Sequence, residues 1–254
     1  MNNKELLSIK KIISEGEWYH TIIYDGISSN GTFNYNPIIE KLNFPKMDGL
    51  TVLDVGCSDG FFSKYFINDL NAKYVKGVDF NSYDGSVAFE VLERYKENFE
   101  EKYTEHNDFN RLKEHYDNIG LRNSNKFLLL KKIFDLNMEF EEGNIYNLSK
   151  FDIHDVVFCG SLLEHLRDPV TAIEQLYFKT GKFCVIDISN TFKSLKPYLK
   201  YTSSGGNFFH YSDSAIKSMM KNVGFKNVKI LKNYKIKIEK YGYKIPHIIV
   251  MGEK

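Results

Sequence analysis

The sequence predicts an α/β fold: a seven-stranded, mostly parallel sheet with helices on both faces and a helical insertion after strand two. From Thr51 onward, short β-rich runs alternate with helical stretches, which is the pattern of parallel strands joined by right-handed crossovers. The first run leads into a glycine-rich turn and then into a helix-like segment. No repeat or low-complexity linker divides the chain, so we expect residues 1–254 to form a single domain.

The predicted elements follow from local patterns in chain order. Residues 1–48 are expected to form an N-terminal cap that is first helical, because apolar residues recur at helical spacing in its first turns, and then irregular and aromatic. Five core strands are expected at Thr51–Val55, Tyr74–Asp79, Met138–Glu141, Asp155–Gly160 and Phe183–Ile188.

The C-terminal part predicts a helix followed by a pair of strands. Ser212 to Val223 is helical in pattern, with Ser212 as the N-cap and Gly224 as the left-handed stop. Strands are expected at Lys226–Leu231 and His247–Gly252. The segment between them is too short for a helical crossover, so we expect an antiparallel pair at one sheet edge, with the last strand antiparallel.

One connection is longer than a crossover requires. Charged residues with a helical period occupy residues 84–137, between the second and third strands. They predict a helical insertion, either a solvated pair of surface helices or a lid or specificity element.

Composition excludes several functional classes. The formal net charge is +1, which predicts no overall attraction to a phosphate backbone. The three cysteines, Cys57, Cys159 and Cys184, form no C-x-x-C pair and fit reduced thiols in a cytoplasmic protein. No Cys/His cluster has ligand spacing, so no metal site is expected. No apolar run is long enough to span a bilayer, and the N-terminus lacks the apolar core of a signal peptide.

The stretch "VLDVGCSDG" places an acid inside an apolar strand, followed by two glycines in a G-x-x-x-G spacing. Glycine lets the chain turn sharply and lets its backbone approach a ligand closely. The dinucleotide fingerprint G-x-G-x-x-G is not met, and Asp59 would repel a pyrophosphate. Asp54 and Asp59 instead predict a positively charged ligand.

This stretch resembles the first motif of class I S-adenosylmethionine-dependent methyltransferases, with Ser58 in place of the middle glycine. The resemblance implies a Rossmann-like fold and S-adenosylmethionine as cofactor, with S-adenosylhomocysteine as its product. It also implies that Asp79 binds the ribose hydroxyls and that Asn144 meets the adenine amino group, with Ile145 packing nearby. The segment "HDVVFCGSLLEHLRDP" resembles the fourth motif of the family. The cofactor-binding residues implied in this way are Asp54, Gly56, Cys57, Ser58, Asp59, Gly60, Asp79, Phe80, Asn144, Ile145, Gly160 and Ser161.

The methyl acceptor is less constrained by the sequence. A neutral hydroxyl requires a general base, whereas an ionised phosphate or carboxylate does not. His165, shortly after the fourth strand, is the first candidate for a catalytic base; His20 is the second, and His210 also follows a predicted core strand.

Three functions therefore remain open. The first is transfer of a methyl group to an oxygen of a small molecule, such as a sugar- or nucleotide-linked molecule or an anionic phosphate-type acceptor. The second is modification of a tRNA wobble uridine, because "WYHTI" and "GSLLEHLRDP" are similar to that branch of the family. The near-neutral charge disfavours nucleic acid as a partner. The third is a non-catalytic cofactor-binding module. The sequence predicts no oligomeric state.

Overall fold

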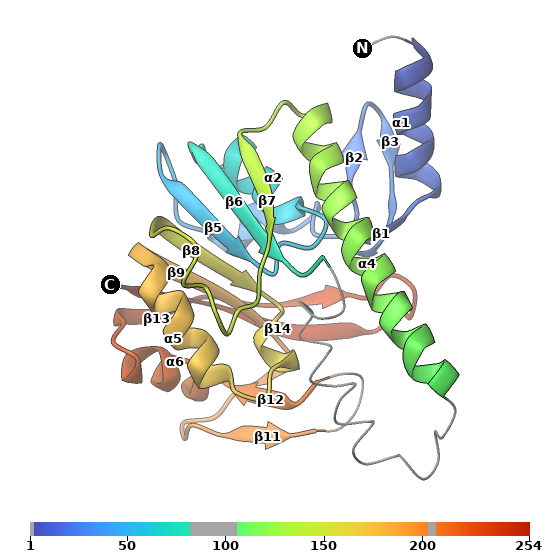
Figure 1. Ribbon diagram of the computed structural model, residues 1–254. Helices are drawn as coiled ribbons and strands as arrows, with labels where there is room; N and C mark the ends of the chain where they lie inside the picture. Colours follow the sequence, from blue (N-terminus) through green and yellow to red (C-terminus); the bar gives the residue numbers. More distant parts are fainter. Residues whose placement is uncertain (1–2, 82–105, 203–206) are drawn as a thin grey trace.

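The computed structural model describes residues 3–81, 106–202 and 207–254. Its centre is a seven-stranded sheet in the order β13-β14-β9-β8-β5-β6-β7 (Figure 1). Neighbouring strands from β7 to β9 pair in parallel, and β14 is antiparallel to both β9 and β13. The last strand is therefore the one that runs against the others, which confirms the predicted fold class. The strands are β5 (Thr51–Val55), β6 (Tyr74–Asp79), β7 (Met138–Glu142), β8 (His154–Gly160), β9 (Thr180–Ser189), β13 (Lys226–Lys237) and β14 (Lys244–Glu253).

The two faces of the sheet have separate apolar cores. Side chains alternate along a strand, so Val52 packs on one face of β5, while Leu53 and Val55 pack on the other. The first face is covered by α1 (Asn3–Glu15), α2 (Phe61–Asn68) and α4 (His106–Ile133), and the second by α5 (Pro169–Lys179) and α6 (Asp213–Asn222) (Figure 1). We call the first face the cap face, because the N-terminal segment also packs there.

The N-terminal cap contains more regular structure than we expected. After α1, strands β1 (Glu17–His20) and β4 (Asn30–Phe33) pair in parallel, and β2 (Ile23–Tyr24) pairs with β3 (Ile27–Ser28). The short 3₁₀ helix η1 (Ile39–Leu42) precedes β5. Trp18 and Tyr35 are buried against the cap face of the sheet.

The C-terminal part agrees with its local signals. The Ser212 hydroxyl accepts a hydrogen bond from the Ala215 amide at the start of α6, and Gly224 ends the helix with φ of 117°. Strand β13 runs six residues beyond the predicted Leu231, because a register shift between Ile230 and Lys232 lets its pairing with β14 continue. A small sheet of β10 (Thr191–Phe192), β12 (Phe209–Ser212) and β11 (Leu199–Tyr201) lies between β9 and α6 in sequence.

The predicted insertion is described only in part. Helix α4 forms its second half and packs against α2 and β7. The first part of the predicted segment, up to residue 105, lies outside the described residues. Its role as a lid or specificity element stays a prediction.

Gly77, in the middle of β6, is a test of how closely α4 packs. A Cβ built there would lie 2.5 Å from Cε2 and 2.7 Å from Cζ of Phe127, a fully buried side chain of α4. We expect Gly77→Ala to lower the free energy of unfolding by about 1–3 kcal/mol, because the core has no space for the methyl group. Chemical denaturation measures this. Combining Gly77→Ala with Phe127→Leu should cost less stability than the two single changes added together, because the smaller leucine leaves space for the new methyl group. A double variant whose loss equals that sum would contradict the packing explanation.

Candidate active site

The turn after β5 is built by backbone hydrogen bonds and left-handed residues. Gly56, Ser58 and Gly60 have φ of 83°, 49° and 85°. The Gly56 amide donates to the Val78 carbonyl at 2.7 Å, which ties the turn to the end of β6. A Cβ at Gly60 would lie 2.8 Å from the Phe127 ring, so glycine is required there for space as well as for conformation. The turn therefore brings the carboxyl ends of β5 and β6 together.

Asp79 lies at the end of β6 and holds this turn. Its Oδ2 accepts a hydrogen bond from the Ser58 amide at 2.6 Å, and its Oδ1 accepts one from the Phe80 amide at 2.8 Å. Burial raises the pKa of Asp79 to about 6, although the two amide donors act in the opposite direction. Each carboxylate oxygen can accept a further hydrogen bond, so Asp79 keeps capacity for a ligand hydroxyl.

A small pocket opens beside Asp79 at this edge of the sheet. It is lined by Val55, Gly56, Val78, Asp79, Phe80, Gly143, Asn144, Ile145 and Leu162. Five of these, namely Gly56, Asp79, Phe80, Asn144 and Ile145, are residues predicted to bind the cofactor. The Asn144 side chain also accepts a hydrogen bond from the Tyr146 amide, which fixes its orientation at the turn.

Asp54 projects from β5 onto the cap face. Its Oδ2 accepts a hydrogen bond from the Ser63 hydroxyl at 2.6 Å, whereas its buried Oδ1 has no hydrogen-bond partner. Burial raises the pKa of Asp54 to about 7; Ser63 opposes the shift, and the nearby Asp79 and Asp59 add to it. An unpartnered carboxylate oxygen can accept a hydrogen bond from a cationic ligand, and the predicted role of Asp54 at the cofactor stays a prediction.

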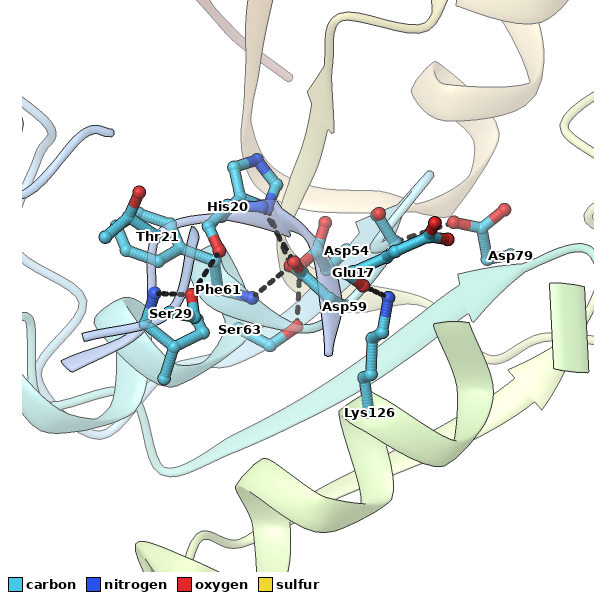
Figure 2. Close-up of polar contacts among 12 residues, drawn as sticks. Glu17, His20, Thr21, Ser29, Asp54, Asp59, Phe61, Ser63, Asp79 and Lys126 are labelled. Atoms are coloured by element: carbon cyan, nitrogen blue, oxygen red, sulfur yellow. Dashed lines mark hydrogen bonds and ion pairs between the residues drawn. The ribbon is translucent and has the colours of Figure 1, made fainter. Parts of the chain in front are cut away.

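The structure brings His20 and Asp59 together, although they lie 39 residues apart (Figure 2). His20 Nδ1 lies 2.6 Å from Asp59 Oδ1, and the His20 amide donates to Asp59 Oδ2 at 2.8 Å. The imidazole also stacks on Phe61, with ring centroids 5.1 Å apart. Burial alone would raise the pKa of Asp59, but the charge and hydrogen bonds of His20 outweigh it and leave that pKa lowered. Both predicted roles, Asp59 at the cofactor and His20 as base, stay predictions; the structure shows a buried pair that attaches the cap to the glycine-rich turn.

The loop after β8 carries the remaining predicted residues. Gly160 ends the strand opposite Asp187 of β9, and the Ser161 amide donates to the Asp187 carbonyl at 2.8 Å. His165 is partly buried in the 3₁₀ helix η3 (Leu163–His165). Burial raises the pKa of the Cys57 thiol well above its usual range, so Cys57 is a component of the turn and not an activated nucleophile.

A second polar cluster on the cap face was missed at the sequence level. Asp187 accepts a hydrogen bond from the Tyr234 hydroxyl, and its Oδ1 lies 3.2 Å from His247 Nδ1. Asp187 and His247 are both buried. An acid and a histidine within otherwise apolar strands were the only sequence signals for this cluster, because the partners come from three separate strands.

Metal-ligand clusters and membrane-spanning helices are both absent from the described parts of the chain. Among residues 3–81, 106–202 and 207–254, no group of three or more His, Cys, Asp or Glu side chains could hold a metal ion. No helix within those ranges is both long and apolar enough to cross a membrane.

The sheet has one reversed final strand, a glycine-rich turn after the central strand and an acid at the end of the next strand. These features agree with the fold expected for a class I methyltransferase. A family model described as "Methyltransferase domain" matches residues 33–230. The chain belongs to this methyltransferase family, and the resemblance to S-adenosylmethionine-dependent enzymes is confirmed at the level of the class. No curated protein sequence matches the chain.

Solved structures agree on the fold. The N-terminal domain of EvdMO1, crystallised in the presence of SAH and D-fucose, is 12% identical with a TM-score of 0.60, covering 100% of this chain and 97% of that chain. The longer EvdMO1 structure is 13% identical with a TM-score of 0.59, and the match covers 100% of this chain but 48% of that one. A structure from Haloferax volcanii, of the Trm112 methyltransferase activator with a putative methyltransferase, is 11% identical with a TM-score of 0.53, covering 86% and 88%. At these identities the likeness concerns the fold.

Proposed function

We propose that this methyltransferase transfers the methyl group of S-adenosylmethionine to a hydroxyl oxygen of a small, polyhydroxylated molecule. When bound, the cofactor supplies a methyl group already activated on a sulfonium. Asp79 would bind its ribose hydroxyls, Asn144 its adenine, and Asp54 its amino group. The glycine-rich turn would hold its methionine part without steric hindrance, because Gly56 and Gly60 carry no Cβ.

One observation carries the choice of acceptor. Within the part of the chain that the structure describes, the buried side-chain atoms without a hydrogen-bond partner are Asp54 Oδ1, Glu164 Oε2, Asn207 Oδ1 and His247 Nε2. The oxygens among them are acceptors, and the His247 nitrogen also becomes one when Nδ1 carries the proton and donates to Asp187. Asp54 Oδ1 is already assigned to the cofactor. Buried polar groups normally have partners, so the other three atoms favour an acceptor rich in hydrogen-bond donors. Hydroxyl groups meet this requirement, and phosphate groups do not. The sugar in the crystals of the EvdMO1 domain is a neutral molecule of that kind.

The same observation disfavours an RNA acceptor, since buried carboxylates at the site would repel a phosphate backbone.

The test is to incubate the protein with methyl-labelled S-adenosylmethionine and a cell extract separated into small solutes, RNA and protein. We expect base-stable label in the small-solute fraction, as for a methyl ether. Label found only in RNA would refute the proposed acceptor. Binding of the cofactor without label in any fraction would favour the non-catalytic module.

Cofactor affinity should depend on pH through Asp54. A cationic amino group binds the ionised carboxylate, and the pKa of Asp54 is raised to about 7. We therefore expect affinity for S-adenosylmethionine to rise about tenfold between pH 6 and pH 8, with release of a proton on binding near neutrality. Calorimetry in buffers of different ionisation enthalpy measures both effects. In Asp54→Asn most of the pH dependence should disappear, leaving a smaller part from Asp79; an unchanged dependence would exclude Asp54 from this role.

A further inference from the structure

Glu164 occupies the loop that follows β8, in η3, and is 1% exposed. Its Oε1 accepts hydrogen bonds from both the hydroxyl and the amide of Ser189 at the end of β9. Its Oε2 is buried and has no hydrogen-bond partner. An acid in this state is costly to stability, because burial removes water from a carboxylate without replacing all of its hydrogen bonds. Such a cost suggests a ligand or a reaction.

The backbone around Glu164 is held from two sides. The Glu164 carbonyl accepts a hydrogen bond from the Phe208 amide at 2.7 Å, and the neighbouring Leu163 carbonyl accepts one from the Tyr211 hydroxyl at 2.8 Å. Together with the two bonds from Ser189, these contacts fix the position of the carboxylate before any ligand arrives. Such preorganisation is what a group needs in order to act on a reacting atom.

Tyr19 of the cap is close enough to Glu164 for the charge of the carboxylate to influence its phenol. The tyrosine is 39% exposed, and its ring packs edge-on against His20. The pKa of the Tyr19 phenol is raised. Desolvation is the largest cause, and the negative charges of Glu164, Asp59 and Asp187 add to it in decreasing order. Tyr19 is therefore influenced by the charges of three carboxylates while part of its side chain keeps contact with solvent.

We propose that Glu164 is the catalytic residue that removes the proton from the acceptor hydroxyl, and that Ser189 is its positioning residue. This inference rests on the proposed function, because only a neutral hydroxyl needs a base. The acceptor's O–H bond breaks and the proton moves to Oε2, which leaves Glu164 neutral. The acceptor oxygen uses the freed electron pair to bond to the methyl carbon, and the electrons of the broken carbon–sulfur bond remain on sulfur. The donor loses its positive charge and the carboxylate its negative charge, so the step is balanced.

The assignment differs from the histidine bases expected from the sequence. Asp59 holds both Nδ1 and the amide of His20, and this pair already has a structural role. His165 is adjacent to Glu164 in the chain, and the two are separable by substitution. Under the proposal, His165→Ala reduces turnover far less than a change at Glu164.

The experiment compares Glu164→Gln with Asp168→Asn. Gln keeps an oxygen for Ser189 but cannot take the proton. Asp168 is a control four residues away. It caps α5 by accepting a hydrogen bond from the Thr171 amide at 3.0 Å, and asparagine caps a helix about as well, so this change should leave both Tm and chemistry nearly unchanged. The probes are methyl-labelled S-adenosylmethionine with the small-solute fraction for turnover, S-adenosylhomocysteine for calorimetry, and thermal unfolding of the protein without cofactor.

For Glu164→Gln we expect a Tm equal to or above that of the wild type, since a buried charge is removed. We expect unchanged affinity for S-adenosylhomocysteine, turnover lower by about 10²–10⁴-fold, and loss of the acidic limb of the pH–rate profile. Glu164→Asp should restore part of the turnover. A lowered Tm with wild-type turnover and pH profile would show that Glu164 is structural and overturn the proposal. If Glu164→Gln labels small solutes as fast as the wild type does, this inference is wrong but the proposed function stands. If label is found only in RNA, the proposed function is wrong.

Discussion

Replacing Asp59 by alanine is expected to lower the free energy of unfolding by about 2–5 kcal/mol, because two buried hydrogen bonds to its carboxylate are lost together. Asp59 is 0% exposed, and it binds both the imidazole and the amide of His20. Without it, both the imidazole Nδ1 and the backbone amide of the buried His20 lose their hydrogen-bond partner. The cap would then be only weakly attached to the glycine-rich turn. Denaturation by urea at neutral pH measures the change.

The pH dependence provides a second measurement of the same pair. The pKa of Asp59 is lowered in the folded protein, so the folded state binds its proton less tightly than the unfolded chain does. This contribution to stability is therefore fully present above the unfolded pKa of about 4 and is lost as pH falls through the lowered folded value. Asp59→Ala should be less acid-sensitive than the wild type in that range. The exposed Asp69, changed to alanine, serves as a control and should change stability by less than about 0.5 kcal/mol; an equal loss in both variants would contradict the role of the pair.

Asp79→Ala is expected to weaken binding of S-adenosylmethionine by about 1.5–3 kcal/mol, or roughly 10- to 150-fold. The substitution removes a carboxylate that can accept hydrogen bonds from the ribose hydroxyls and that also holds the Ser58 and Phe80 amides in place. Part of the effect will therefore come from a less ordered turn. Calorimetry with S-adenosylhomocysteine measures the affinity.

Two controls separate these contributions. Glu141→Gln removes an acid of β7, the strand that pairs with β6. The Glu141 carboxylate contacts Lys76 and Lys150, so the affinity for S-adenosylhomocysteine should stay nearly constant. Amide hydrogen exchange at residues 56–60 reports the order of the turn directly. A folded Asp79→Ala protein with wild-type affinity would remove Asp79 from the cofactor site.

Local patterns were sufficient to predict the core of the fold. Thr51–Val55 and Tyr74–Asp79 were predicted with the observed bounds, because buried parallel strands are short apolar runs that end at turn residues. The helix from Ser212 was equally predictable, since its N-cap and its glycine stop are local signals. The exact end of β13 was not, because strand length depends on how far a partner continues to pair.

Five of the twelve residues predicted to bind the cofactor line the pocket beside Asp79, and their roles toward the cofactor stay predictions. A glycine-rich turn, and acids placed at strand ends, follow one another in chain order, and parallel strands bring their carboxyl ends to one edge. Gly56, Asp79 and Asn144 accordingly line one pocket. Predicting that these three residues lie together required the order of the strands in the sheet, but no other long-range contact.

The pairing of the other polar residues was decided only by the tertiary structure. Asp59 could be identified as an acid near a ligand site, but its closest partner, His20, comes from a cap strand 39 positions earlier. Glu164 stands in the same short motif as His165, yet its buried environment arises because Ser189, 25 residues later, ends the neighbouring strand. Local sequence specifies strands, turns and caps through backbone preference and side-chain alternation. Which carboxylate is paired and which keeps an unpartnered oxygen depends on chain segments that meet only when the sheet and its cap have packed.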